Sequence, residues 1–389
     1  MTRIVIFTGK GGVGKTTVAA AHAWQSAQMG SQTLLVSTDM AHNLGDLFER
    51  RVGREETEII PGLTALELDP EYIMQQEFGD LLQALGRMMG TREASEEIRI
   101  PGMENLFALL KLLALYESGR YEHIIVDCAP TGETLALLKL PELLSWYMER
   151  FFPLGKLAVR VLSPLSKKIF QMELPDKNAM NDIERLYSRL LALQSVLKDA
   201  QVTSIRLVTL AEKMVVAETK RSYMYLNLYG YQVDGLYINR VLPRDMAEPF
   251  FAQWLAIQET YIKELTAVFG HLPIVRLPWY ETDICGQESL QRLTAEVLGS
   301  DDQFCVRSRV EHERYLPVED GYLLILYLPL VQKEELEVYQ SAADLIVRIG
   351  NFKRSIPLPN SLRHAEIVSA RLPDQTLKVH LRKEVPHET

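Results

Sequence analysis

The chain has 389 residues, of which 47% are hydrophobic and 24% charged, and its formal net charge at pH 7 is −9. This composition excludes a disordered or collagen-like protein, and the acidic balance disfavours a nucleic acid held through its phosphate backbone. The length predicts roughly two or three domains.

The three cysteines, Cys128, Cys285 and Cys305, lie far apart in the sequence and form no CxxC pair. Neither a zinc site nor a disulfide framework is therefore predicted. No stretch approaches the roughly 18 uninterrupted apolar residues of a membrane-spanning helix, and the first residues lack the pattern of a secretory signal. We expect a cytoplasmic protein, or one of the plastid stroma if a transit segment has been removed.

Residues 1–304 alternate short β-branched runs with long helical patterns, and the runs are continuously apolar. Strands are predicted at Ile4–Phe7, Thr33–Val36, His123–Asp127, Arg206–Leu210, Gly235–Asn239 and Pro273–Leu277. Strands that are apolar on both faces and separated by helices indicate a mainly parallel sheet covered on both sides. An α/β domain is therefore predicted over residues 1–304.

The segment Gly9–Thr16 reads G-K-G-G-V-G-K-T and fits the P-loop motif G-x-x-x-x-G-K-[ST]. It follows the first predicted strand and opens a helix predicted to run to about Met29. Its glycines allow successive backbone N–H groups to turn towards phosphate oxygens, while Lys15 neutralises phosphate charge and Thr16 ligates Mg²⁺. The predicted cofactors are ATP and Mg²⁺, and the predicted nucleotide-binding residues of this loop are Gly9, Lys10, Gly11, Gly12, Val13, Gly14, Lys15, Thr16 and Thr17.

Two carboxylates follow the next predicted strands. Asp39 comes shortly after Thr33–Val36, where a carboxylate can orient or deprotonate the attacking water. Asp127 ends an apolar run, which is typical of the Walker B aspartate that holds Mg²⁺ directly or through water. Cys128 is predicted to be a small buried residue. The predicted catalytic residues are Asp39 and Lys15, and the predicted metal-binding residues are Thr16, Asp39 and Asp127; the role of Lys10 follows below from a family resemblance.

The region 134–201 has a mostly helical pattern that is rich in large apolar side chains interleaved with Lys and Arg. Two interpretations remain open, because amphipathic helices of this kind form either ordinary core or a groove for an apolar client.

The tail, residues 305–389, has a different sequence pattern from residues 1–304 and carries equal numbers of basic and acidic side chains. Closely spaced runs with alternating polarity predict strands at Gly321–Leu328, Glu335–Tyr339, Asp344–Ile349, Phe352–Pro357, Glu366–Leu372 and Thr376–Arg382. Such spacing is typical of an antiparallel β-sandwich, which a short polar linker near residues 299–302 joins to the first domain.

The P-loop with its additional Lys10 resembles the deviant Walker A family, which includes partition ATPases, the nitrogenase iron protein and the ArsA-type ATPases. That resemblance implies a nucleotide-sandwich homodimer in which Lys10 reaches the partner's phosphates and stabilises transition-state charge there.

Further segments are similar to signatures of the ArsA and guided-entry ATPases. Asp39–Leu44 resembles their switch I sequence D-P-A-H-N-L, with Met40 in place of proline. This resemblance implies that Asp39 activates water and that Asn43 lies beside the nucleotide. Asp127–Leu135 resembles their switch II sequence D-T-A-P-T-G-H-T-L, with Cys128 and Glu133 at the threonine and histidine positions.

Two later segments match the same family. The segment around Asn239 corresponds to the family's adenine-contacting segment, and an amide side chain can both donate to and accept from an adenine edge. The loop containing Pro278 and Trp279 resembles the family's loop that closes over the base. These matches stand in the family's order across about 300 residues of the chain.

The tail is similar to α-crystallin (small heat-shock) domains. Tyr327–Leu330 resembles their L-P-G turn, Phe352–Pro359 their F-x-R-x-x-x-L-P stretch, and Ala370–Val379 their A-x-x-x-N-G-V-L pattern, with Gln375 in place of the glycine. An immunoglobulin-like sandwich is the alternative fold. An ArsA-type ATPase followed by such a domain resembles a branch of cyanobacteria and plastids.

The resemblance implies a dimeric ATP-hydrolysing chaperone or targeting factor. Its nucleotide-gated groove would take a hydrophobic or amphipathic client helix, and a membrane receptor is a possible further partner. The family's metalloid-binding cysteines and the zinc clasp of its eukaryotic targeting branch have no counterpart here, so no zinc is expected. The alternatives are an ATPase subunit of an arsenite-type anion efflux system and a partition or positioning ATPase.

Overall fold

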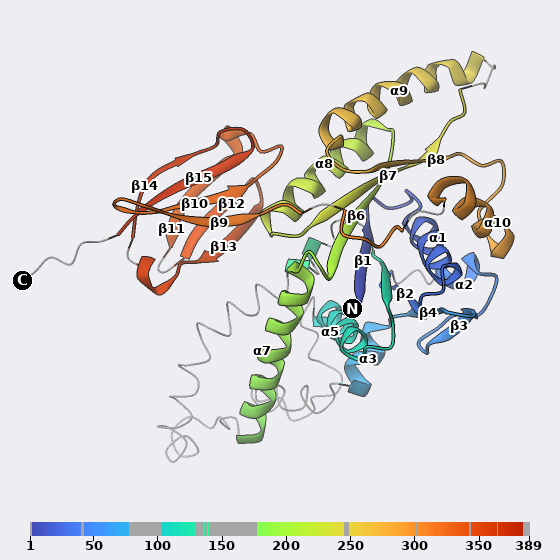
Figure 1. The fold of residues 1–389 in the computed structure, drawn as a ribbon, viewed down its shortest axis with the longest axis horizontal. Coiled ribbons are helices and arrows are strands. Elements are labelled where there is room, and N and C mark those ends of the chain that lie inside the picture. Colours follow the sequence, from blue (N-terminus) through green and yellow to red (C-terminus); the bar gives the residue numbers. More distant parts are fainter. Residues whose placement is uncertain are drawn as a thin grey trace, which may run out of the picture. The chain divides into compact units, whose positions relative to one another are not determined.

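The computed structural model describes residues 2–39, 43–77, 103–129, 132, 135–136, 138–139, 177–244, 249–299, 302–307, 309–341, 344–363 and 365–383. The chain divides into two compact units. The first unit comprises Met1–Thr203 with Thr282–Phe304, and the second comprises Ser204–Glu281 with Cys305–Thr389. Figure 1 shows the elements of both units.

The first unit is built on strands in the order β3-β4-β2-β5-β1. They are β1 (Arg3–Thr8), β2 (Thr33–Ser37), β3 (Thr57–Ile60), β4 (Leu63–Glu67) and β5 (His123–Asp127). All neighbours are parallel except β3, which runs antiparallel to β4. Every residue of β1 and β2 is buried, as expected for strands that are apolar on both faces.

The helices of the first unit are α1 (Lys15–Gln28), α2 (Asn43–Leu47), α3 (Pro70–Glu77), α5 (Met103–Glu117), α7 (Lys177–Lys198), α10 (Gly286–Leu293) and the π-helical η1 (Thr294–Leu298). Helix α1 packs against β2 and β5, α10 packs against α1, and α5 contacts both α3 and α7. In the described part of the chain, no helix has the length and apolar composition needed to cross a membrane. The cytoplasmic location stays a prediction.

The second unit begins with three parallel strands, β6 (Thr203–Leu210), β7 (Val233–Val241) and β8 (Ile274–Pro278), in that order. Helix α8 (Lys213–Leu228) lies between β6 and β7 in sequence, and α9 (Pro249–Phe269) lies between β7 and β8. Helix α8 contacts β7, α9 and the following β-domain.

The β-domain, which we call the sandwich, consists of two antiparallel sheets ordered β14-β15-β10-β9 and β11-β12-β13. The strands are β9 (Glu313–Val318), β10 (Gly321–Tyr327), β11 (Leu336–Ser341), β12 (Asp344–Ile349), β13 (Phe352–Pro357), β14 (Glu366–Arg371) and β15 (Thr376–Arg382), with short 3₁₀ turns η2 (Lys333–Glu335) and η3 (Asn360–Leu362). Alternate residues such as Leu324, Leu326, Leu377 and Val379 are buried in its core. This alternation is typical of strands with one solvent face.

The core of the sandwich extends onto helix α8, since Met224 and Leu228 belong to the same buried cluster. The ring of Tyr225 stacks on Phe352 with centroids 3.5 Å apart. The buried Arg354 donates to the carbonyl oxygen of Leu228 at 3.0 Å. The sandwich is therefore packed onto α8 by apolar and polar contacts within one unit.

The predicted fold class is confirmed: a mainly parallel sheet with helices precedes an all-β antiparallel domain. The predictions missed β3, β4 and β9. Strand β3 has only four residues and lies at a sheet edge, and β9 is an edge strand that contains Pro317. Both features weaken the sequence signal. Of the helical region predicted at 134–201, residues 134, 137 and 140–176 lie outside the described residues, and α7 accounts for much of the rest.

Candidate phosphate and magnesium site

The P-loop joins β1 to α1 in the predicted strand–loop–helix order. Gly12 and Gly14 have φ angles of 77° and 89°, a left-handed conformation that glycine adopts without a steric cost. Gly14 directly precedes α1, so the loop ends at the N-terminal N–H groups of a helix. Lys15 begins that helix and is only 6% exposed. Such a helix start favours bound anions.

Three strand ends meet beside this loop. In register, Asp127 on β5 lies opposite Phe7 on β1 and opposite Ser37 on β2. The Thr16 hydroxyl donates to Asp127 Oδ2 at 2.7 Å. The structure therefore brings together two of the three predicted metal-binding residues, although they are 111 residues apart in sequence.

The surroundings of Asp127 fit a divalent cation. Its side chain is 1% exposed, and Oδ1 has no hydrogen-bond partner among the described residues. Burial raises the pKa of Asp127 to about 6, against the opposing effects of the Thr16 hydrogen bond and the Lys15 charge. A buried carboxylate oxygen without a partner is costly. Together with the Thr16 hydroxyl it forms the hard oxygen donor set that Mg²⁺ prefers.

Asp39 lies two residues beyond the end of β2 and is partly buried. Its backbone N–H donates to Ser37 Oγ at 3.2 Å, and the preceding Thr38 N–H donates to the Asp127 carbonyl oxygen at 2.9 Å. The charge of Asp39 contributes to the raised pKa of Asp127, which places both carboxylates in one electrostatic environment.

Other predicted residues of the switch segments are only partly described. Residues 40–42, the side chain of Asn43 and residues 130, 131, 133 and 134 lie outside the described residues. Cys128 is buried, as predicted. Lys10 is partly buried, Val13 is 1% exposed, and Gly11 and Gly12 are exposed.

Glu67 is a residue of this site that the sequence analysis missed. It ends β4, is 3% exposed, and its Oε1 accepts a hydrogen bond from the Leu44 N–H at 3.0 Å. It thereby holds the first turn of α2, which follows the switch segment. A carboxylate at a helix N-terminus is favourable. The Pro61-Gly62 turn ahead of β4 is the signal that could have revealed this strand.

Asn239, Pro278 and Trp279 lie in the second unit, so their role in base recognition stays a prediction. Asn239 is on β7, and its Oδ1 accepts from the Arg240 N–H at 2.8 Å. Pro278 ends β8, and the Trp279 N–H donates to the Val241 carbonyl oxygen at 2.9 Å. Trp279 is 51% exposed.

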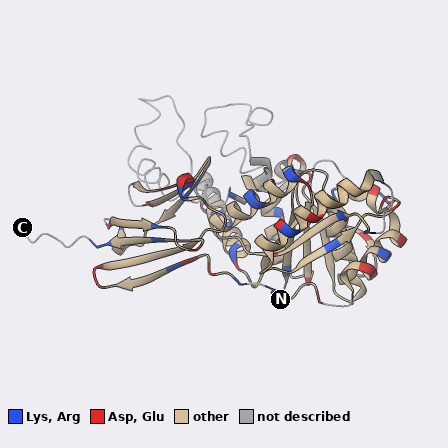
Figure 2. Cartoon of the chain, turned by 90° about the horizontal axis from the view of Figure 1, so that it is seen from above, with Lys and Arg blue, Asp and Glu red and all other residues tan. Residues whose placement is uncertain are grey.

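Within the described ranges, no group of three or more His, Cys, Asp or Glu side chains could hold a metal by itself. The pair of Thr16 and Asp127 is instead typical of a cation that protein and nucleotide hold jointly. Figure 2 shows Lys and Arg interspersed with Asp and Glu along the described helices and strands. The arrangement can bind a nucleoside triphosphate with its metal and support phosphoryl transfer to water.

Comparison with known proteins agrees with this site. Residues 2–299 match the model of the anion-transporting ATPases, and residues 319–381 match that of an HSP20-like domain found in ArsA. The similarity to α-crystallin domains predicted for the tail is thereby confirmed.

Full-length relatives are similar to the whole chain. A protein of Chlorobaculum tepidum, named provisionally as an arsenical pump-driving ATPase, is 35% identical over 97% of this chain and 95% of its own. A second, from Aquifex aeolicus and named in the same way, is 31% identical over 95% and 97% of the two chains. The ATPase GET3 of Malassezia globosa is 30% identical over 74% of this chain and 88% of its own.

Proposed function

Because the chain belongs to the anion-transporting (ArsA) ATPase family and is thus an ATP-hydrolysing enzyme, we propose that it works as a dimeric chaperone or targeting factor. In this proposal, ATP binding closes a groove around a hydrophobic or amphipathic helix of a client protein, and hydrolysis releases it, for example to a membrane receptor. The observation that best supports ATP hydrolysis is the hydrogen bond between Thr16 and Asp127 at the end of the P-loop.

Each residue of the site has a proposed task. Lys15 and the N–H groups of the loop bind the phosphates, and Thr16 and Asp127 hold Mg²⁺. When bound, Mg²⁺ supplies neutralisation of charge on the phosphate oxygens. Asp39 orients the attacking water and accepts its proton. Glu67 keeps the start of α2 in place through its hydrogen bond with the Leu44 N–H.

Lys10 supports the proposed homodimer. It lies early in the loop and Lys15 already begins α1, so the two lysines occupy different parts of the phosphate site. A second cation contributed by a partner subunit would stabilise transition-state charge as an arginine finger does.

Helix α9 offers an apolar face for contact between subunits. Phe250, Trp254 and Ile257 follow the i, i+4, i+7 spacing of one helix face, and they are 72%, 47% and 36% exposed. Ile262 and Leu265, in contrast, are buried. Exposed apolar faces of this kind commonly mark interaction sites. Since no zinc clasp is expected, we propose that this face contributes to dimerisation.

Client binding is supported by the apolar composition of residues 143–172 and by the similarity to the ATPase GET3 over 74% of the chain. A groove of Leu, Met and aromatic side chains can adapt to different apolar helices. ATP can open or close such a groove only if it binds the two states with different affinity.

A pump-driving ATPase for arsenic compounds is the second candidate, because two relatives that match nearly the whole chain carry that name. The cysteines weigh against it. Cys128 is buried, Cys285 and Cys305 are exposed, and no metal-binding cluster occurs in the described residues.

Mixing two inactive variants tests the dimer. In Lys10→Ala the subunit keeps its own phosphate site but cannot assist its partner, whereas Lys15→Ala has the opposite defect. If Lys10 acts on the partner's nucleotide, an equal mixture should recover roughly a quarter of wild-type ATP hydrolysis, from one working site in each mixed dimer. Activity that stays at the level of the separate variants contradicts this arrangement.

Trp254→Glu should lower the dimer fraction in the presence of Mg-ATP.

A labelled synthetic helix of about 20 apolar residues tests client binding. The Asp39→Asn variant, which should hold ATP without cleaving it, is expected to bind this helix about tenfold more tightly with Mg-ATP than without nucleotide. Lys15→Ala and a helix carrying three lysines are the controls. Affinity that does not depend on nucleotide contradicts the targeting role. Hydrolysis by the wild-type protein that arsenite stimulates and the helix does not would instead favour the pump role.

A further inference from the structure

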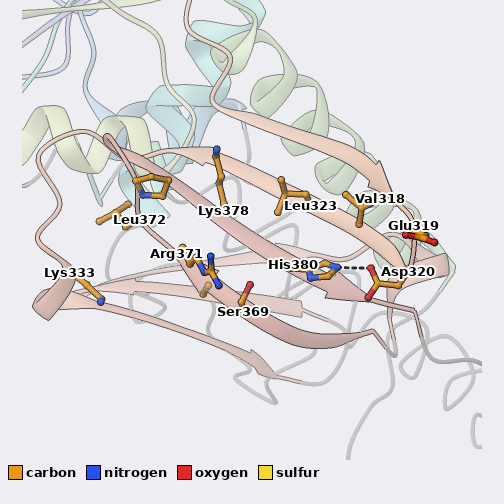
Figure 3. Close-up of a pocket in the computed structure, with 12 residues that line it drawn as sticks. Val318, Glu319, Asp320, Leu323, Lys333, Ser369, Arg371, Leu372, Lys378 and His380 are labelled. Carbon is orange, nitrogen blue, oxygen red and sulfur yellow. Dashed lines mark hydrogen bonds and ion pairs between the residues drawn. The ribbon is translucent and has the colours of Figure 1, made fainter.

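A trough of about 890 Å³ lies on the solvent face of the four-stranded sheet of the sandwich. Its lining comes from β9, β10, β14, β15 and the turns beside them. Figure 3 shows Asp320 and His380 towards one end, Lys333 and Leu372 towards the other, and Arg371 and Lys378 between them. The trough lies entirely within the second unit and contains none of the residues assigned to ATP chemistry.

Two cations face each other across neighbouring strands in this trough. In the register of β14 and β15, Arg371 lies directly opposite Lys378. The same row continues to Ile325 on β10 and Arg314 on β9, so it contains no acidic residue. Residues directly opposite in an antiparallel pair point to the same face, and like charges there repel. Both Arg371 and Lys378 are exposed.

The other sheet of the sandwich shows how such a pair is normally compensated. There Arg348 lies opposite Lys353, which is also a like-charged pair. The next residue in that row is Glu337, whose Oε2 lies 3.4 Å from Arg348 Nη1. In that sheet the Glu337 carboxylate thus offsets the two positive charges. In the four-stranded sheet the uncharged Ile325 takes the equivalent place beside Lys378.

Asp320, at the acidic end of the trough, does not supply the missing negative charge. Asp320 Oδ1 is hydrogen-bonded to His380 Nε2 at 2.8 Å, and Asp320 Oδ2 accepts from Arg382 Nε at 3.3 Å. These contacts, the one to His380 first, lower the pKa of the Asp320 carboxyl. Asp320 is therefore engaged with its own neighbours, while Lys333 adds a third cation near Arg371 and Lys378.

We propose that this trough binds a short extended peptide in which apolar side chains stand two positions before and two positions after an acidic one, because alternate side chains of an extended strand share one face. The carboxylate lies between Arg371 and Lys378, and the apolar side chains contact Leu323, Leu372 and Pro373. The volume is that of a typical small-ligand site. Charge-assisted hydrogen bonds to a carboxylate are the stronger kind, and such a group completes the row as Glu337 does in the other sheet.

The lining favours a peptide over a nucleic acid. Glu319 at one end repels a polyanion, and among the described residues no Phe, Tyr or Trp lines the trough to stack on bases. Apolar groups beside a compact cluster of cations instead match one carboxylate with apolar neighbours.

The test uses the full chain and a capped, fluorescein-labelled pentapeptide with leucine at positions 1 and 5, glutamate at position 3 and serine at positions 2 and 4. Its counterpart with glutamine at position 3 is the neutral probe. The glutamate peptide should bind the wild-type protein about tenfold more tightly than the glutamine peptide, and 0.5 M salt should weaken it. Lys378→Glu, which gives Arg371 an opposite charge on the next strand, should lower the affinity about tenfold. Lys353→Glu, on the compensated row of the other sheet, should leave it unchanged.

Thermal unfolding of each variant reports whether the sandwich remains folded, because the phosphate site lies in the other unit. The proposal is overturned if both peptides bind alike, if Lys378→Glu and Lys353→Glu have the same effect, or if neither peptide binds the folded wild-type protein. Displacement of the glutamate peptide by single-stranded RNA at lower concentration than by unlabelled peptide would also overturn it, in favour of a nucleic acid.

Discussion

The phosphate site and the sandwich trough both depend on charged side chains, but these are buried at the phosphate site and exposed in the trough. At the phosphate site, Asp127 is almost fully buried, and burial raises its pKa to about 6. In the trough, Arg371 and Lys378 are exposed to water, which screens their repulsion. Replacing a buried charged residue should change activity and folding stability strongly, because water cannot take over its interactions. Replacing a residue of an exposed pair should change mainly the affinity for a ligand.

The largest expected difference between the two regions concerns Lys15 and Lys378. Lys15→Ala should lower kcat for ATP hydrolysis about a hundredfold or more, because it removes a buried cation that faces the phosphates. Lys378→Ala should change kcat by less than about twofold. Steady-state phosphate release measures both. Loss of activity in both variants would mean that the trough and the nucleotide site are coupled.

The next effect concerns folding stability at the phosphate site. The pKa of Asp127 is about 6 in the folded chain, above the ordinary value of 3.8. The folded state therefore binds the proton more tightly, and its free energy of unfolding should fall by on the order of 2 kcal/mol as pH rises from 4 to 7. Asp127→Asn should remove this part of the pH dependence in metal-free, nucleotide-free protein, as urea unfolding would show.

The exposed Glu58 provides the matched control for Asp127. Glu58→Gln should leave the pH dependence of unfolding as it is in the wild-type protein. If Asp127→Asn and wild-type chains keep parallel stability profiles across this range, the carboxylate is not buried in the way that the structure shows.

The smallest effect is expected in the sandwich. Lys378→Glu replaces a repulsive cross-strand pair with an attractive one, which should raise the free energy of unfolding by about 0.5 kcal/mol. Thermal unfolding at low and high salt measures this gain, which should shrink as salt screens the pair. A variant less stable than wild type at low salt would show that Arg371 and Lys378 do not repel each other.

The two regions also differ in how far the sequence predicts them. The P-loop is a contiguous segment whose glycines and lysines have direct backbone and electrostatic roles, so Gly9–Thr16 could be interpreted locally. Asp127 was predictable because an apolar strand runs into it. Glu67 was not, because the strands of the β3–β4 hairpin are only four and five residues long and give a weak periodic signal.

The trough could not be predicted because it depends on strand register. Leu323, Arg371 and Lys378 come from three strands, and only the pairing of β10, β14 and β15 aligns them on one face. Each strand was predicted from its alternation, but a shift of one residue would have turned these side chains to the other face.

The packing of α8 against the sandwich has a consequence for truncating the chain. Met224 and Leu228 complete the interior of the C-terminal domain, and the helix that carries them lies directly before β7 in sequence, the strand of Asn239. A fragment that ends at residue 304 would expose this apolar face of α8 to solvent. Such a fragment should therefore aggregate unless Met224 and Leu228 are replaced by hydrophilic residues.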